Sequence, residues 1–562
     1  MVCKRKSGIN PLSLSRRGVF IKHSPAFWLC PGPTEQATMA KRLDSTLNIG
    51  HKLQVRTPPT VAFWMSLAIV ALTMSLGLTR CKTAWFDETA YAAPAIDWCQ
   101  HDQMRLVNYP NVASAKATLF IVHPLLLGTF FKLFGIGLVQ SRAFVLLCYL
   151  LLLAVCHRLF SAWKLPSYAA WMGVLTLAVD PAIVWQVRSG RPDMLPILLT
   201  AITAWVLTLC YQWPTRVGRR CLACVGGALA ALVPITHPYA VPGLSVVVLA
   251  WLLATFRGGD RRESLASTLF LIGGGMLALA ILFVCFFPPL PDLLAGMAIG
   301  NAYLAENREA GLGVPRRILI EITRRWARGS FIEPIRWLFL LVGFPLAARS
   351  HRMLVSICVC WLLVLFAFLA IWVPKNTWYQ TAYAALPMAG LIAAVADAIG
   401  EAGASRRIIL PLLWVTSFAL GFALLVLYPV AAIQQWQLRS HDLLKQKLIE
   451  LIPPGSVVAC DPGAYFANIE NGCTTYYSYL KLRGLDHDPV LSNAYQKGLI
   501  SQSGVRYFVI NREIFPEVLQ GAVFLGTTGM LKQASWFVQD PSYDFDVYEI
   551  RNAESAPEGA RP

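Results

Sequence analysis

The chain has 562 residues, of which 56% are apolar and only 14% are charged. Soluble domains contain roughly 45–50% apolar and about 25% charged residues, so the composition excludes an ordinary cytosolic protein. The mean hydropathy of +0.52 agrees. The apolar runs between Val61 and Val430 have room for about ten to twelve membrane spans of about 20 residues each. We therefore expect a polytopic α-helical membrane protein.

The formal net charge of +18 does not indicate nucleic-acid binding, because the basic residues form short clusters between the apolar runs. Such clusters are typical topology signals, since cytoplasmic loops of membrane proteins are rich in Lys and Arg. The fourteen cysteines do not indicate a disulfide scaffold, because many lie inside apolar runs, where a thiol behaves as a small hydrophobe. No CxxC pair has zinc-ligand partners beside it in the sequence.

The first 60 residues are basic, with ten Lys and Arg against two acidic residues, and we expect them to form a cytoplasmic segment. They contain no visible cleavable signal. Met39 opens the sequence MAKRLDST, which makes it a candidate for the true start of translation. N-terminal sequencing of the product would decide between the two starts.

The apolar runs predict eleven membrane spans, at 61–79, 142–160, 166–184, 194–212, 221–236, 240–256, 266–287, 333–348, 353–373, 379–397 and 408–430. The apolar stretch 117–139 is interpreted as a juxtamembrane or re-entrant helix on the outer side. A helix from Pro124 to Gly137 reaches only about 20 Å, which is short of the roughly 30 Å hydrocarbon core. With this interpretation five short basic loops, which hold twelve Lys and Arg, lie on the side of the N-terminus. The C-terminus then lies outside.

The spans delimit a transmembrane domain over residues 61–430, with outer loops at 80–141 and 288–332. The second loop contains a basic amphipathic helix whose six arginines, Arg308 to Arg328, run against the rule that basic loops lie inside. It is interpreted either as an interfacial helix held by lipid head groups or as a phosphate contact.

Residues 431–550 have the composition of a small soluble α/β domain. The sequences SVVACD, RYFVIN and YDFDVYEI predict strands, and HDLLKQKLIELI predicts a helix. Cys460 and Cys473 are candidates for a disulfide in this outer domain, although nothing in the sequence fixes that pairing. The tail 551–562 is expected to be disordered.

Two adjacent carboxylates follow the first predicted span, in the sequence Trp85-Phe86-Asp87-Glu88. Ionisable residues at a membrane are costly enough that a functional role is the default interpretation. One carboxylate can act as a general base while its neighbour positions a hydroxyl or a sugar. The alternative is a solvated loop without a catalytic role. Asp87 and Glu88 are our candidate catalytic residues.

A second group of charges extends from Arg188 to Asp193, in the sequence Arg-Ser-Gly-Arg-Pro-Asp. If the segment forms a helical turn, Arg188 and Arg191 face one side and can bind the same phosphate, for which the planar guanidinium is well suited. Equally, Pro192 and Asp193 are residues that a helix start prefers. Both interpretations stay open at this point.

Histidines and a lysine complete the set of candidates. His123 and His237 each precede a proline, and Lys375 lies close to Trp378 and Tyr379 near the start of a predicted span. A single His-Pro pair is commonly only a device that ends a helix. The candidate contacts to a donor phosphate are therefore Arg188, Arg191, Lys375, Tyr379 and His123.

The order of these motifs resembles the GT-C glycosyltransferases, in particular the branch with protein O-mannosyltransferases, lipid A aminoarabinose transferases and related bacterial mannosyl- and galacturonosyltransferases. The resemblance covers residues 61–400. It rests on the Asp-Glu pair after the first span, a His-Pro-Leu-Leu segment that ends in Phe-Gly, Ser141-Arg142 at the second span, and Arg191-Pro192-Asp193 before the fourth. Where family members often have Pro-Pro or Lys-Pro, this chain has His123-Pro124.

The resemblance implies metal-independent or weakly metal-dependent transfer of one sugar from a polyprenyl-phosphate donor to a lipid, glycan or protein acceptor on the outer face, with inversion. It implies that Asp87 is the catalytic carboxylate, with Glu88 as its neighbour and Asp193 in the second-loop motif. No cofactor is required, although a divalent cation is compatible with the sequence, and no nucleic acid partner is expected. The protein would lie in the cell (inner) membrane in contact with membrane lipids.

The chemistry of an outer site agrees with this implication. That compartment has no nucleotide sugars, so an activated sugar has to arrive on a lipid carrier. A phosphate leaving group needs positive charge as its bond breaks, which Arg188, Arg191 and Lys375 would supply.

Two other classes of protein stay open from the sequence. A lipid or solute transporter would place its ionisable residues near the middle of the bilayer on broken helices, whereas these residues cluster at the outer ends of spans. A non-catalytic scaffold that carries an outer binding domain would not need the Asp-Glu and Arg-x-Asp groups. Transfer of radiolabelled sugar separates the three classes.

Overall fold

The fold is taken from a computed structural model of the chain, which describes residues 58–80, 84, 86–105, 107, 120–258, 260–286, 332–372, 382–399, 403–434, 436–478, 489–511, 522–530 and 544–551. The predictions made for residues 1–57, for the basic helix at 288–331 and for the tail 552–562 lie outside the described residues. So do those made for Lys375 and Tyr379.

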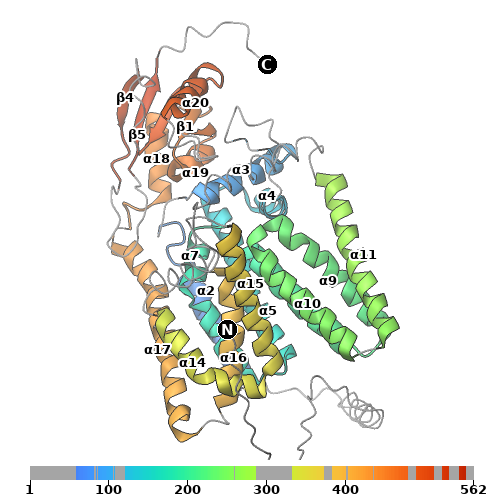
Figure 1. Cartoon of the computed structure of the whole chain (residues 1–562). Helices are drawn as coiled ribbons and strands as arrows, with labels where there is room; N and C mark the ends of the chain where they lie inside the picture. Colours follow the sequence, from blue (N-terminus) through green and yellow to red (C-terminus); the bar gives the residue numbers. More distant parts are fainter. Residues whose placement is uncertain are drawn as a thin grey trace, which may run out of the picture. The chain divides into compact units, whose positions relative to one another are not determined.

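Every apolar run that was predicted to span the membrane carries a helix. These helices are α2 (Pro58–Ser75), α5 (Leu138–Ala162), α6 (Ser167–Ala178), α7 (Pro181–Arg188), α8 (Met194–Gln212), α9 (Arg216–Thr236), α10 (Val241–Gly258), α11 (Arg261–Phe286), α14 (Ile332–Ser350), α15 (Arg352–Trp372), α16 (Ala382–Ala398) and α17 (Ala404–Gln434). Figure 1 shows α9, α10 and α11 side by side, as their mutual contacts require.

The number of crossings stays a prediction. Within the described ranges seven helices are long and apolar enough to cross a membrane, or up to eight if the bent pair α6 and α7 is one span. Helix α14 is not one of them, and it contains three charged residues, Glu333, Arg336 and Arg349. The helical character of the predicted spans is confirmed, and the count of eleven is not.

The predicted span 166–184 is not one continuous helix, because it breaks at Asp180. The Asp180 carboxylate accepts hydrogen bonds from the backbone N–H groups of Ala182 and Ile183 at 3.0 and 3.3 Å, and Pro181 occupies the first helical position. These features start a new helix and stop the preceding one. As a result α6 and α7 meet at an angle of 54°.

The stretch 117–139 contains a short helix, α4 (Val122–Phe134), which is separate from α5. Its 13 residues give a length of about 20 Å, in agreement with the prediction that this segment is too short to cross. It packs against α3 (Phe86–His101) at Gly128, where a β-carbon would lie 2.5 Å from the carbonyl oxygen of Ala95. Glycine therefore allows the two helices to approach closely. The side of the membrane on which α4 lies stays a prediction.

The C-terminal residues form the predicted α/β domain. Its helices are α18 (His441–Leu451), α19 (Pro462–Glu470) and α20 (Pro489–Ser501), and its strands are β1 (Val457–Cys460), β2 (Thr474–Tyr477), β3 (Tyr507–Ile510), β4 (Ala522–Thr527) and β5 (Asp546–Ile550). The strand order is β2-β1-β3-β5-β4, with β1 parallel to β2 and β3, and with β5 antiparallel to β3 and β4. Cys460 and Cys473 are buried free thiols, so this candidate pair is not bonded.

Candidate functional site

Asp87 and Glu88 lie in the first turn of α3, where acidic side chains interact favourably with the positive end of the helix dipole. Their environments differ sharply. The Asp87 side chain is 32% exposed, whereas that of Glu88 is completely buried. Two consecutive side chains on a helix point about 100° apart, so one can reach a substrate while the other faces the protein.

Glu88 forms a two-pronged ion pair with Arg142 on α5. The Arg142 Nε and Nη2 atoms donate to Oε1 and Oε2 of Glu88, both at 3.0 Å, and the Arg142 Nη1 atom donates to the Leu78 carbonyl at 2.7 Å. Both side chains of the pair are fully buried. In the sequence, only the family resemblance drew attention to Arg142. The structure makes it the partner that fixes Glu88.

Asp87 engages a different arginine, Arg191, whose Nη1 atom donates to the Asp87 carboxylate. The Nε atom of the same arginine donates to Oδ2 of Asp193 at 3.0 Å. Asp193 in turn accepts a hydrogen bond at 2.9 Å from the hydroxyl of Tyr383 on α16. One line of hydrogen bonds therefore connects the start of α3, the turn before α8 and the start of α16.

Gly190 permits the close approach of the arginine turn to α3. Its backbone φ is +60°, a conformation that favours glycine. A β-carbon at this position would lie 2.1 Å from Oε1 of Glu88. The sequence showed a glycine here, but only the packing of the turn on Glu88 shows why no other residue fits.

The turn also separates Arg188 from Arg191. Helix α7 ends at Arg188, so the two arginines do not share a helical turn as one interpretation assumed. The Arg188 guanidinium is buried and donates to the carbonyl oxygens of Thr73 and Leu76 at the end of α2, at 2.8 and 2.9 Å. The structure therefore does not bring Arg188 to the carboxylates of Asp87 and Asp193.

The Asp193 carboxylate binds side chains outside the helix that it precedes. It precedes α8, but its side chain makes no capping hydrogen bond with that helix. Both carboxylate oxygens instead bind side chains from outside α8, namely those of Arg191 and Tyr383. The functional interpretation of the Arg-x-Asp motif stays a prediction.

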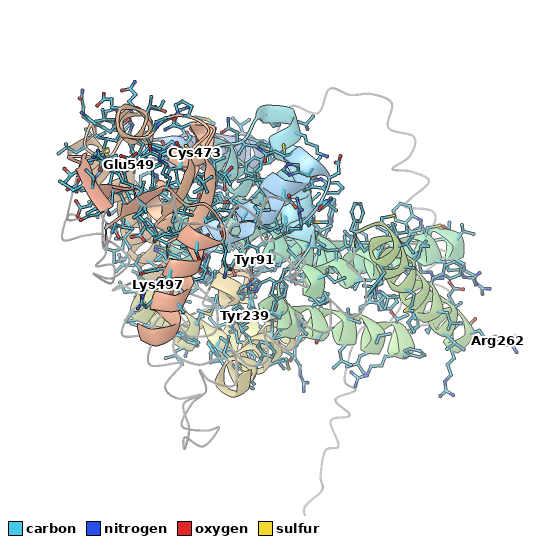
Figure 2. All side chains as sticks on the ribbon, turned by 90° about the horizontal axis from the view of Figure 1, so that it is seen from above. Tyr91, Tyr239, Arg262, Cys473, Lys497 and Glu549 are labelled. Carbon is cyan, nitrogen blue, oxygen red and sulfur yellow. The ribbon has the colours of Figure 1, made fainter. Side chains whose placement is uncertain are left out.

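The two candidate histidines lie beside this line of hydrogen bonds, among aromatic side chains. The His237 Nε2 atom is 4.0 Å from Oδ1 of Asp193, and the His237 ring stacks on Phe120 at 5.6 Å between centroids. Tyr91 and Tyr239, labelled in Figure 2, both have their rings against His237, at 6.5 and 4.7 Å. His123 contacts Tyr91 from α4, with ring centroids 5.8 Å apart.

Burial keeps both histidines uncharged. It lowers the pKa of His123 from 6.5 to about 3, and it lowers the pKa of His237 below 6.5 although Asp193 acts in the opposite direction. Burial alone would raise the pKa of Asp193, but the charge of Arg191 and the hydrogen bonds from Arg191 and Tyr383 outweigh it, so the pKa lies below its usual value. At neutral pH the Asp193 carboxyl is therefore ionised, and both imidazoles are neutral. His123 can therefore contact a phosphate only through a neutral hydrogen bond.

The remaining candidates are not tested by this geometry. Lys375 and Tyr379 lie outside the described residues. Tyr383 and Tyr91, which do line the site, were not singled out in the sequence, because a lone tyrosine in or near an apolar run gives no signal. Within the described part of the chain, no group of three or more His, Cys, Asp or Glu side chains is arranged to hold a metal ion.

No family model and no curated protein matches this chain by sequence. Its structure is similar to that of ArnT from Cupriavidus metallidurans in the apo state, with a TM-score of 0.57 and 14% identity over 89% of this chain and 99% of that chain. It is also similar to ArnT from the same organism bound to undecaprenyl phosphate, with a TM-score of 0.56 and 14% identity over 88% of this chain and 99% of that chain. This chain therefore has the fold of the GT-C membrane glycosyltransferases, as its resemblance in sequence predicted.

Proposed function

We propose that this chain is an integral membrane glycosyltransferase. It moves a single sugar from a polyprenyl-phosphate-linked donor to a lipid, glycan or protein acceptor on the outer face of the cell (inner) membrane, with inversion. The observation that carries the proposal is the different environment of the two adjacent carboxylates. Asp87 is accessible beside a buried arginine, while Glu88 is committed to an internal ion pair.

Asp87 has the role of general base. Of the carboxylates brought together at this site it is the one that an acceptor hydroxyl can reach, because Glu88 and Asp193 are fully buried. General-base catalysis requires an ionised group within hydrogen-bond reach of the proton that it removes. Contact with the Arg191 guanidinium fixes the direction of the Asp87 carboxylate.

The reaction is a single displacement. The acceptor hydroxyl gives its proton to Asp87 while its oxygen attacks the anomeric carbon of the donor. The bond between that carbon and the phosphate oxygen breaks, and the polyprenyl phosphate leaves with the electron pair. One displacement at the anomeric carbon inverts its configuration.

Positive charge near the leaving phosphate comes from Arg191, whose guanidinium lies between two carboxylates. Arginine suits this role because its fork of donors can bind a phosphate and keep a carboxylate contact. From the sequence, Lys375, Tyr379 and His123 remain proposed contacts on the donor side. The structure does not support Arg188 as a contact, since its Nη1 and Nη2 atoms donate to the carbonyl oxygens of Leu76 and Thr73. No metal ion has a role in the proposal.

The lipid-linked donor is proposed on two grounds. An outer site has no nucleotide sugars, and the ArnT structure with this fold was determined with undecaprenyl phosphate. The sidedness rests on the basic loops. Cysteine labelling should find Arg219 inside and Glu450 outside, and labelling of Glu450 from the cytoplasmic side would overturn the proposed orientation.

The decisive experiment is transfer of a radiolabelled sugar from polyprenyl phosphate in membranes with and without the protein. Labelled acceptor should form only with the protein present. A protein that moves the labelled lipid across the bilayer without forming product would be a transporter. A protein that does neither would be a scaffold, and either result would refute the proposal.

A further inference from the structure

The C-terminal α/β domain contacts both helices that hold the Glu88–Arg142 ion pair. Tyr477, at the end of β2, forms a hydrogen bond of 2.5 Å with Thr89 on α3. Glu470, at the end of α19, accepts a hydrogen bond of 3.1 Å from the backbone N–H of Leu138, the first residue of α5. The domain thus contacts α3 through Tyr477 and α5 through Glu470.

The first contact lies next to Asp87 and Glu88 in the chain. Thr89 directly follows Glu88 in the first turn of α3, and both Thr89 and Tyr477 have no exposed surface. The Tyr477 backbone is itself held, because the hydroxyl of Tyr495 donates to its carbonyl oxygen at 3.0 Å. A buried hydrogen bond between two hydroxyls restrains the rotation of α3 about its axis and its position along that axis.

The second contact restrains the start of α5. The first N–H groups of a helix have no partner within it, and a carboxylate placed there is stabilising. Two other side chains hold the Glu470 carboxylate in place. The His441 Nε2 atom lies 2.9 Å from its Oε1 atom, and the Lys445 Nζ atom lies 3.6 Å from its Oε2 atom. Arg142, the partner of Glu88, lies on α5 about one helical turn beyond Leu138.

We propose that Tyr477 and Glu470 are positioning residues for sugar transfer. Their two contacts set the relative placement of the first turns of α3 and α5, which keeps the Glu88–Arg142 pair closed and directs Asp87 toward the acceptor. This inference rests on the proposed function. Misplacement of a reacting group by about 1 Å is enough to cost about a hundredfold in rate, so contacts remote from the reacting atoms can limit turnover.

The kinetic test uses Tyr477→Phe, which removes one hydroxyl, and Glu470→Ala with its conservative counterpart Glu470→Gln. We expect kcat to fall at least about fivefold in Tyr477→Phe and Glu470→Ala, the factor that corresponds to a hydrogen bond worth about 1 kcal/mol. Donor KM should stay unchanged, and Glu470→Gln should recover part of the loss because its amide oxygen can still accept from Leu138. The effects of Thr89→Val and Tyr477→Phe should be less than additive, since both variants lose the bond that these two hydroxyls share.

Matched controls lie within the same domain. Tyr507 donates only a long hydrogen bond, 3.5 Å, to Glu549, and the Glu549 side chain is 15% exposed, as is that of Glu470. Tyr507→Phe and Glu549→Ala therefore make the same chemical changes away from α3 and α5. Equal kinetics in the positioning variants and these controls would overturn the proposal.

Hydrogen–deuterium exchange gives a measurement that does not depend on activity. Exchange should become faster at the start of α5 in Glu470→Ala and at the start of α3 in Tyr477→Phe, and it should stay unchanged in the controls. Unchanged exchange at both helix starts would refute the positioning role even with active enzyme. A wild-type chain without transferase activity would refute the proposed function, while the exchange result would still decide whether the domain restrains the two helices.

Discussion

Asp87 and Glu88 are neighbours in the chain, yet their carboxylates bind different arginines on different parts of the molecule. Asp87 contacts Arg191 in the turn before α8, and Glu88 contacts Arg142 on α5. The exposed acid is thereby available for chemistry, and the buried acid fixes the helix that carries it. The family resemblance implied that Asp87 is the catalytic carboxylate, and the exposure of its side chain agrees with that proposed role.

Replacement of Asp87 should abolish the chemistry and spare the fold. Asp87→Asn keeps the shape of the side chain and removes its charge, so transfer should fall by at least about a hundredfold. The initial rate of transfer of radiolabelled sugar measures this. Asp102→Asn is the matched control, because Asp102 follows α3 and its side chain is 75% exposed. Near-normal turnover in Asp87→Asn would show that Asp87 is not the base.

Replacement of Glu88 should act first on stability. Glu88→Gln leaves the buried Arg142 without its ionic partner, and removal of one member of a buried pair costs about 3–5 kcal/mol. Thermal unfolding in detergent should detect this loss. The double variant Glu88→Gln with Arg142→Met should recover part of it, since no unpaired charge remains. A stable Glu88→Gln protein with no transfer would instead assign Glu88 to the chemistry.

Gly190 should tolerate no side chain. Gly190→Ala forces a β-carbon against Glu88 and a left-handed backbone on alanine, the second of which costs about 1–2 kcal/mol by itself. Gly504→Ala is the control for this backbone cost, because Gly504 has a φ of +66°, close to the +60° of Gly190, but nothing within 4 Å of its would-be β-carbon. Unfolding should occur at a lower temperature in Gly190→Ala than in Gly504→Ala. Equal unfolding temperatures would mean that the turn moves away from Glu88 at little cost.

Arg191 should affect the donor as well as the base. Arg191→Ala should weaken binding of polyprenyl phosphate and slow transfer, and Arg191→Lys should restore only part because lysine lacks the planar fork. Donor binding and steady-state kinetics measure the two effects. Kinetics identical to the wild type in Arg191→Ala would favour the interpretation of this motif as a mere helix start.

The contact of Glu470 with α5 should weaken in acid. Burial raises the pKa of Glu470, but the hydrogen bond and charge of His441, with the Leu138 N–H group and Lys445, outweigh it and hold the pKa below the usual 4.5. The ionised carboxylate therefore stabilises the folded protein at pH values above 4.5, and this stability is lost as the pH falls through the lowered pKa. Thermal unfolding of the wild type and of Glu470→Gln should converge in acid and differ near neutral pH. A constant difference would contradict this assignment.

The sequence by itself determined the helices of the transmembrane domain, the short helix within the first outer loop and the α/β character of the C-terminal domain. Each of these follows from local patterns of apolar residues, which set secondary structure without reference to distant parts of the chain. It also indicated Asp87, Arg191 and Asp193 as candidates, because charged residues at the ends of apolar runs are conspicuous, and the structure brings these three side chains together.

Only the tertiary structure decided which of these residues meet. Arg142 lies 54 residues from Glu88, Tyr383 lies 190 residues from Asp193, and Tyr477 lies 388 residues from Thr89. No local pattern encodes such pairs, since they depend on how helices pack against one another and against the α/β domain. The same holds for Arg188 and Arg191. They are three residues apart and were candidates for one phosphate. Because α7 ends at Arg188 and the chain turns at Gly190 with a positive φ, the two side chains have different partners.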